Sequence, residues 1–254
     1  MNQFTVEGTL ALVTGATRGI GLGAAEALAR SGANLILTGR DQSELERAAD
    51  QLRSLTKAVH TAPYDLLQTN GIAAWFEGVC SVAGTPEILV NSAGISRQGP
   101  AVDLTLDDWN DVMTLNATAI FELSRMFARR LIGEGKQGRV INIASLMTTA
   151  ARPGTSPYTA SKGAVGQLTK VMAVEWARHG ILVNAIAPGY IETDLNKALA
   201  ADPAFDNWVK GRCPLGRWGT PQDIAWPIVF LASPAANFIT GQVIYVDGGW
   251  LATF

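Results

Sequence analysis

The chain has 254 residues, of which 48% are hydrophobic and 17% are charged, and its formal net charge is -2. This length and apolar content predict one domain, spanning residues 1–254, with a large buried core. The near-neutral charge excludes a general electrostatic attraction to nucleic acid or to an anionic membrane surface.

Two cysteines are too few for a disulfide framework, and they suit a reducing compartment. The amino-terminal residues are polar, without the apolar region of a signal peptide, and no apolar run approaches the ~18 residues of a membrane span. We therefore expect a cytoplasmic protein that neither inserts in a membrane nor binds nucleic acid.

The first predicted strand, residues 10–13, is followed by a glycine-rich turn and then by an Ala/Leu-rich helix over 22–31. The turn spaces its glycines as G-x-x-x-G-x-G. Such a turn lets the backbone approach a pyrophosphate at the helix amino end, whereas the alternative is a tight turn without a ligand. The flanking strand and helix favour a dinucleotide, with contacts from Gly15, Thr17, Arg18, Gly19, Ile20 and Gly21.

The second predicted strand, residues 34–38, ends without the carboxylate that usually binds an unphosphorylated ribose. Arg40 stands near that position instead. Arg40 and Arg18 could clamp a 2′-phosphate, which we favour over the alternative that Arg40 is a solvated helix-start residue. The sequence thus predicts NADP(H) as the preferred cofactor and leaves NAD(H) open.

The third and fourth strands are predicted over 60–65 and 87–90, with helices over 43–55 and 72–83. Asp65, followed by Leu66, could accept from the adenine amino group or could cap the next helix. The small-residue turn after the fourth strand would let a cofactor lie across the strand ends. We expect its contacts from Asn91, Ala93 and Gly94.

A long helix is predicted over 106–131, and Asn116 lies inside it. Asparagine is a weak helix former. Its side chain could therefore bond locally to the backbone, or it could point toward a functional site.

A buried strand over 138–144 precedes Ser145, and a helix follows from about 163 to 177. Tyr158 and Lys162 are four residues apart at the start of that helix, on one face. A hydroxyl, a phenol and an ammonium would then converge beyond the carboxyl end of a strand. The ammonium would lower the phenol pKa, so that Tyr158 could exchange a proton with an alcohol or a carbonyl.

The remaining chain predicts a strand over 181–186, a turn at Pro188 and Gly189, and a last strand over 242–246. Residues 191–219 are predicted to be irregular and to form a lid. A helix is predicted over 223–231, starting close to Pro227. Strands and helices alternate throughout, which predicts an α/β fold: a Rossmann-type, doubly wound parallel sheet of about seven strands with helices on both faces.

These motifs resemble those of the short-chain dehydrogenase/reductases over almost the whole chain. The turn after strand four is close to the family's Asn-Asn-Ala-Gly, with Ser92 replacing the second Asn. The resemblance implies that Ser145, Tyr158, Lys162 and Asn116 are the catalytic residues. It also implies that the cofactor carboxamide is held by Pro188, Gly189, Ile191 and Thr193, and that the protein is a homotetramer. No metal is implied.

Arg217-Trp-Gly219 and the ending Val246-Asp-Gly-Gly-Trp-Leu251 are similar to segments of gluconate 5-dehydrogenases and 2-deoxy-D-gluconate 3-dehydrogenases, members that act on sugar acids. This similarity implies a small-molecule sugar acid or polyol as substrate. Arg97 or Arg152 could receive its carboxylate, or both could be surface arginines. The other candidate substrate contacts are Met147, Tyr190 and Trp208.

Two other functions stay open. Met147, Tyr190, Trp208 and Trp218 could line an apolar pocket for 3-oxoacyl-carrier-protein or another hydrophobic ketone. A protein of a different class, which senses a nucleotide without turnover, would keep the same fold. An intact Ser145, Tyr158 and Lys162 speaks against that class.

Overall fold

A computed structural model describes residues 3–253; Met1, Asn2 and Phe254 lie outside the described part. Its centre is a seven-stranded, fully parallel sheet in the order β3-β2-β1-β4-β5-β6-β7. The doubly wound fold predicted from the sequence is confirmed. The strands are β1 Leu10–Thr14, β2 Asn34–Thr38, β3 Val59–Thr61, β4 Ile88–Asn91, β5 Gly138–Ile143, β6 Ile181–Pro188 and β7 Val243–Val246.

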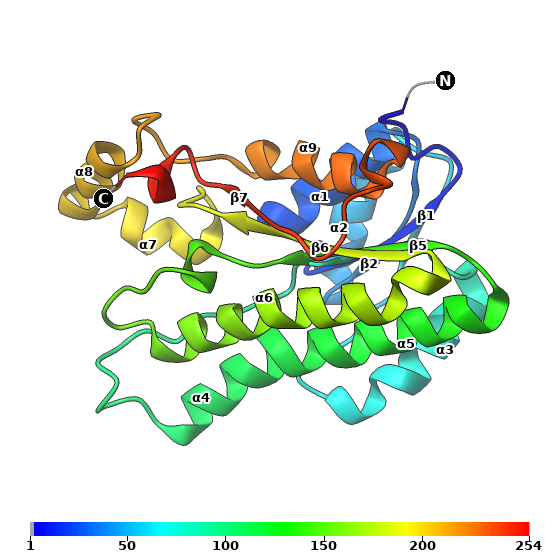
Figure 1. Cartoon of the computed structure of the whole chain (residues 1–254), viewed down its shortest axis with the longest axis horizontal. Helices are drawn as coiled ribbons and strands as arrows, with labels where there is room; N and C mark the ends of the chain where they lie inside the picture. The colour runs from blue at the N-terminus through cyan, green and yellow to red at the C-terminus, as the bar shows by residue number, and fades with distance from the viewer. Residues whose placement is uncertain (1–2, 254) are drawn as a thin grey trace.

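Two helical layers cover the sheet (Figure 1). One layer holds α1 Gly19–Arg30, α2 Gln42–Leu52 and α9 Pro221–Ala232. The other holds α3 Ile72–Ala83, α4 Leu106–Met113, α5 Ala119–Glu134 and α6 Ser156–Trp176. Successive strand residues face opposite layers, because side chains alternate along a strand. Val13 joins the core under α1, whereas Leu12 joins the core under α5, with Phe76 and Phe127.

The strand β3 is shorter than the predicted 60–65. It ends at Thr61, two residues before Pro63. Ala62 N still donates to Leu37 O and Tyr64 N to Gly39 O, both at 2.9 Å, so the missing N–H of Pro63 falls between two donors to β2. Asp65 lies beyond these bonds, outside any strand.

The helix predicted over 106–131 consists of two α-helices joined by a π-helical turn. A capping box between Thr105 and Asp108 starts α4, and α5 runs on to Glu134. Between them, Thr114–Thr118 forms a π-helical turn that contains Asn116. A π turn inserts one extra residue into the helix and often marks a functional site.

The segment 191–219 was predicted to be irregular, and this prediction is wrong. It contains α7 Lys197–Ala200 and α8 Pro203–Arg212. Asp202 caps α8 by accepting a hydrogen bond from Ala204 N, and Pro203 occupies the first helical position. Both helices lie beyond the carboxyl ends of the strands (Figure 1).

The predicted start of α9 near Pro227 is also wrong. The helix begins at Pro221, after a capping box in which the Thr220 hydroxyl and the Asp223 carboxylate each accept from the other residue's backbone N–H. Pro227 lies inside the helix. The favourable helix start at Pro221 thus outweighs the missing donor in the interior. Within residues 3–253, no helix is both long and apolar enough for a membrane span.

Candidate active site

The predicted catalytic residues meet at the carboxyl edge of the sheet. Ser145 follows the end of β5, and Tyr158 and Lys162 lie in the first two turns of α6. Ser145 hydrogen-bonds the phenol of Tyr158. Lys162 Nζ lies 5.6 Å from the centroid of the Tyr158 ring. A hydroxyl, a phenol and an ammonium therefore share one site, as the spacing predicted.

Lys162 is buried and has no carboxylate partner within the described residues. Its side chain is 5% exposed, and its Nζ donates to Ile143 O at 2.6 Å. Burial lowers the pKa of Lys162 to about 8, because the interior disfavours the charged form.

Burial has the opposite effect on the phenol. It raises the pKa of Tyr158, while the hydrogen bond with Ser145 lowers that pKa by less and the nearby Tyr190 raises it further. The phenol is therefore protonated at neutral pH in this structure and can act as an acid. A pKa lowered by Lys162 stays a prediction for the site with its coenzyme bound.

Asn116 is fully buried and points toward the same site. Its Nδ2 donates to Ile95 O at 2.9 Å and to Ser161 Oγ at 3.1 Å, and its Oδ1 accepts from Ile95 N. A Cβ on Gly94 would lie 3.2 Å from Asn116 Oδ1 and 3.9 Å from Lys162 Nζ. The alternative of a local bond within the helix is wrong, because the backbone partner Ile95 lies 21 residues away along the chain. The side chain points toward the site and adjoins Lys162.

The burial of Lys162 predicts a pH-dependent change in stability. The unfolded lysine has a pKa of 10.5 and the buried one a pKa of about 8. Between these values the unfolded chain binds more protons, so stability rises with pH there, and below pH 8 the native state bears the full cost of the buried charge. We expect Lys162→Met, free of coenzyme, to melt at a higher temperature than the wild type at pH 7.

The same reasoning predicts that the difference in melting temperature between Lys162→Met and the wild type is smaller at about pH 10, where the native lysine is neutral. Thermal unfolding at both pH values, followed by circular dichroism, measures it. Lys170→Met is the matched control, because Lys170 is an exposed residue of the same helix. A difference that is the same at both pH values would contradict the argument.

The glycine-rich turn is tightly closed by backbone. A Cβ on Gly21 would lie 2.2 Å from Gly15 O, and one on Gly15 would lie 2.9 Å from Ala93 Cα. Thr14 Oγ1 accepts from the backbone N–H groups of Ser92 and Ala93. The turn after β1 and the turn after β4 are therefore held together as one surface, which runs to Gly94 beside Lys162.

The start of α1 fits a phosphate group. No side chain caps its first turn, so the backbone N–H groups there are available to an anion. Arg18 pairs with Asp194 at 3.4 Å, and both side chains are exposed. Arg40 is exposed as well, and within residues 3–253 it has no ion-pair partner. Thr17 packs near Gly39, and Ile20 is half-buried on the same turn.

Two predicted cofactor residues have other partners. Asp65 accepts from Leu67 N at 3.1 Å within a turn, and Leu66 is buried in the core. The helix-cap alternative for Asp65 is wrong, because Gln68 and Gly71 stand at the N-caps of the helices that follow. The buried Asn91 side chain donates to Ser124 Oγ and to Asn142 Oδ1, across β4, β5 and α5. The Nδ2 group of Asn91 is thus already engaged within the protein.

The segment after β6 lies beside the glycine turn. Gly189 N donates to Val246 O at 2.9 Å, which fixes the turn after Pro188 against β7. Thr193 Cγ2 would lie 3.4 Å from a Cβ on Gly19. Ile191 is buried in the core. Thr193 and the glycine turn, which the sequence placed around one dinucleotide, thus adjoin each other in space.

A pocket opens in front of Ser145 and Tyr158. Met147, Arg152 and Tyr190 line it, whereas Arg97 and Trp208 do not. The sequence did not single out seven further lining residues, because nothing in their local pattern distinguishes them: Ser96, Gln98, Leu146, Thr155, Leu195, Asn196 and Leu199. The last three belong to the segment that was predicted to be irregular.

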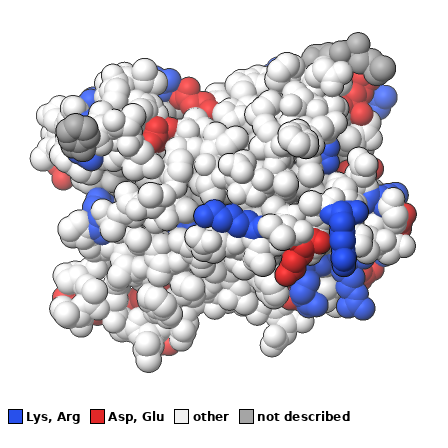
Figure 2. Space-filling model, viewed as in Figure 1, with Lys and Arg blue, Asp and Glu red and all other residues white. Residues whose placement is uncertain are grey.

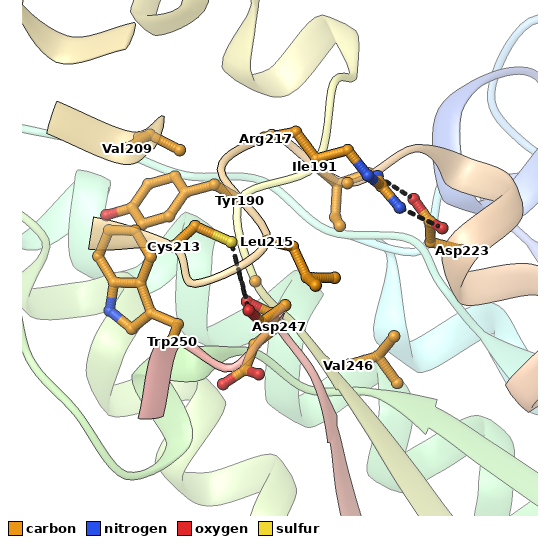
Figure 3. Close-up of a pocket in the computed structure, with 13 residues that line it drawn as sticks. Tyr190, Ile191, Val209, Cys213, Leu215, Arg217, Asp223, Val246, Asp247 and Trp250 are labelled. Atoms are coloured by element: carbon orange, nitrogen blue, oxygen red, sulfur yellow. Dashed lines mark hydrogen bonds and ion pairs between the residues drawn. The ribbon is translucent and has the colours of Figure 1, made fainter. Parts of the chain in front are cut away.

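A larger hollow of about 130 Å³ lies on the other side of Tyr190 (Figure 3). Cys213 and Trp250 face it, and Arg217 is paired with Asp223 at its rim. Tyr190 also packs edge-on against Trp208 and Trp218. Tyr190 lines both hollows, and Ser145 and Tyr158 line the smaller one.

Comparison with known proteins agrees with this site. The family model for Enoyl-(Acyl carrier protein) reductase matches residues 15–251. Gluconate 5-dehydrogenase of Gluconobacter oxydans is 42% identical over 249 residues, covering 97% of this chain and 96% of the relative. Galactitol 2-dehydrogenase (L-tagatose-forming) of Cereibacter sphaeroides is 42% identical over 251 residues, with the same coverage of both chains.

Among solved structures, a gluconate 5-dehydrogenase from Burkholderia cenocepacia, in complex with NADP and tartrate, superposes with a TM-score of 0.96. It is 40% identical and covers 100% of this chain and 99% of its own. The family model and these full-length relatives agree with the motifs and with the geometry of the site. The chain belongs to the short-chain dehydrogenase/reductase family.

Proposed function

We propose that the protein is an NADP(H)-dependent oxidoreductase that interconverts a secondary alcohol of a sugar acid and the corresponding ketone. The observation that carries this proposal is that Ser145 and Tyr158 line one pocket and that Lys162 Nζ lies behind it, 5.6 Å from the centroid of the Tyr158 ring. The relatives named for gluconate support the sugar-acid substrate.

Each residue of the site has a separate role in the proposed reaction. Tyr158 gives its phenolic proton to the forming alkoxide in reduction and takes it back in oxidation. Ser145 holds the same substrate oxygen by a hydrogen bond, and the Lys162 ammonium favours the phenolate once the proton has left. Asn116 positions the lysine end of the site. The bound nicotinamide supplies or accepts the hydride, which is chemistry that no side chain here can provide.

Arg18 and Arg40 support the preference for NADP(H). Both are exposed beside the glycine turn, and the carboxylate that would bind a free ribose hydroxyl is absent from the end of β2. Two guanidinium groups would suit a 2′-phosphate in a bidentate manner.

A substrate panel tests the proposed function. We expect turnover of D-gluconate with NADP⁺ and of 5-keto-D-gluconate with NADPH, and less turnover with NAD⁺ or NADH. A 3-oxoacyl thioester and D-glucitol complete the panel, read as the change in absorbance at the reduced coenzyme. Turnover of the thioester alone would favour the hydrophobic ketone reductase, and coenzyme binding without any turnover would favour the nucleotide-sensing protein.

We also infer that residues 191–219 act as a lid over the bound substrate. This segment contributes Leu195, Asn196 and Leu199 to the catalytic pocket. The ion pair between Arg18 and Asp194 links it to the glycine turn, so that coenzyme and lid adjoin. Both side chains of the pair are exposed, so the link can open.

We propose that the protein is cytoplasmic and that it forms a homotetramer. Val171 and Val174 on α6 are 48% and 82% exposed, and Phe121 on α5 is 44% exposed. Figure 2 shows that the face over α4 and α6 carries few charged side chains. A second copy of the chain would cover this apolar face. Light scattering measures the mass, and Val174→Asp is expected to reduce it.

A further inference from the structure

Arg152 has an unusual environment for an arginine. Its Nε is buried and has no hydrogen-bond partner. Its Nη2 donates to the neutral Gln98 Oε1 at a long 3.3 Å, and the guanidinium carbon lies 5.3 Å from the centroid of the Phe205 ring. No carboxylate within residues 3–253 pairs with it. A buried donor without a partner is costly, and native structures keep few of them.

The other arginines near the site are already neutralised or covered. Arg97 reaches Asp111 at 3.2 Å and Asp108 at 3.7 Å, and it is half-exposed. Arg217 is held by Asp223. The guanidinium carbon of Arg212 lies 5.3 Å from the centroid of the Trp250 ring, on the far side of Tyr190. Among these charges, Arg152 is the one that lines the pocket of Ser145 and Tyr158.

The backbone around Arg152 is held in place. Arg152 O accepts from Thr155 Oγ1 at 2.7 Å, and Gly154 O accepts from Gly99 N at 3.1 Å. Phe205, on the lid helix α8, packs edge-on against Tyr190 at 5.7 Å between ring centroids. Arg152 also lowers the pKa of Tyr190, although burial raises that pKa by more. The backbone that carries Arg152 is thus fixed, and its side chain lines the same pocket as Ser145 and Tyr158.

We propose that Arg152 receives the carboxylate of the substrate through its free Nε and a terminal nitrogen, and thereby selects sugar acids. The proposal rests on the proposed function, because it names the substrate group that this same pocket recognises. Arginine suits this role because its planar fork matches the two oxygens of a carboxylate. Arg152 is a specificity-determining residue and takes no part in the proton transfer.

Two consequences for substrate choice follow. An uncharged polyol leaves the buried donor unsatisfied and loses affinity, because a site built to bond a group rejects the analogue that lacks it. An acyl thioester would place an apolar chain against the charge and is also disfavoured. The favoured substrate is a short aldonic acid whose carboxylate and reacting carbon lie at opposite ends.

The matched substrates D-gluconate and D-glucitol test the proposal, because they differ only in the group at carbon 1. For Arg152→Met we expect kcat/KM for D-gluconate to fall about 10- to 100-fold, mainly through KM, as for loss of hydrogen bonds to a charged group. The value for D-glucitol should stay the same or rise. Arg152→Lys should recover part of the loss, since an ammonium keeps the charge but not the fork.

Arg97→Met is the control, and it should leave KM for D-gluconate near the wild-type value. An unchanged NADPH dissociation constant in Arg152→Met, measured by fluorescence titration, shows that the variant is folded. An unchanged KM for D-gluconate in Arg152→Met overturns the proposal, as does an equal loss with both substrates. A wild type that turns over no sugar acid overturns the proposed function as well, and that failure is visible without any variant.

Discussion

Tyr158→Phe is expected to lower kcat/KM by about 10²- to 10⁴-fold, the usual contribution of a positioned acid or base. The substitution removes only the hydroxyl that Ser145 bonds, and it leaves the ring beside Lys162. Hydride transfer to a ketone would then leave an alkoxide with no proton donor in the buried site. Steady-state kinetics with 5-keto-D-gluconate and NADPH measure the loss.

The NADPH dissociation constant should stay within about twofold of the wild-type value, because transition-state interactions and ground-state binding are separate quantities. Tyr64→Phe is the control. Its hydroxyl donates to Gln68 O, far along the chain from the site, and its removal should leave kcat unchanged. Full activity of Tyr158→Phe would refute the assigned proton donor.

Gly21→Ala is expected to weaken NADPH binding about 10- to 100-fold and to lower the melting temperature by about 4–10 °C. The added Cβ would lie 2.2 Å from Gly15 O and 2.8 Å from Gly15 C. Both are backbone atoms, which cannot rotate away as a flexible side chain would, so the turn must open. Overpacking of this kind costs about 1–3 kcal/mol, and the displaced N–H groups no longer meet a phosphate.

Gly78→Ala separates this steric effect from the general cost of changing a glycine. Gly78 is exposed within α3, and a Cβ there would meet nothing within 4 Å. Alanine is the better helix former, so this variant should gain about 0.5–1 kcal/mol of stability and bind NADPH normally. A Gly21→Ala protein as stable as Gly78→Ala, with normal NADPH affinity, would contradict the tight-turn argument.

Much of the fold could be predicted from the sequence because its signals are local. The buried strands are recognised as short apolar runs. The glycine turn predicts a cofactor site at one strand end, and the Tyr158–Lys162 spacing predicts the reacting groups at another. The family resemblance added Asn116, which local propensity could only mark as unusual. The parallel order of the strands then brings Ser145 and the glycine turn to one edge.

The errors have a common physical origin in competing local signals. Pro227 predicts a break in the helix, but Thr220 and Pro221 make a strong helix start that tolerates it. The segment 191–219 was judged by its prolines, although Pro203 stands at a first helical position where it is favourable. The environment of Arg152 depends on Gln98 and Phe205, which lie far from it in the sequence on either side. No local pattern reveals such contacts.

The π-helical turn at Thr114–Thr118 has a consequence for the phasing of the helix that contains it. One extra residue turns everything after it by about 100° about the helix axis, because an α-helix has about 3.6 residues per turn. Phe127 and Leu131 on α5 face the sheet only with that rotation in place. A chain shortened by one residue here would coil more regularly yet present α5's polar stripe to the interior. Gain or loss of this residue during evolution must therefore be accompanied by substitutions along α5 that move its apolar positions to the face that is then buried.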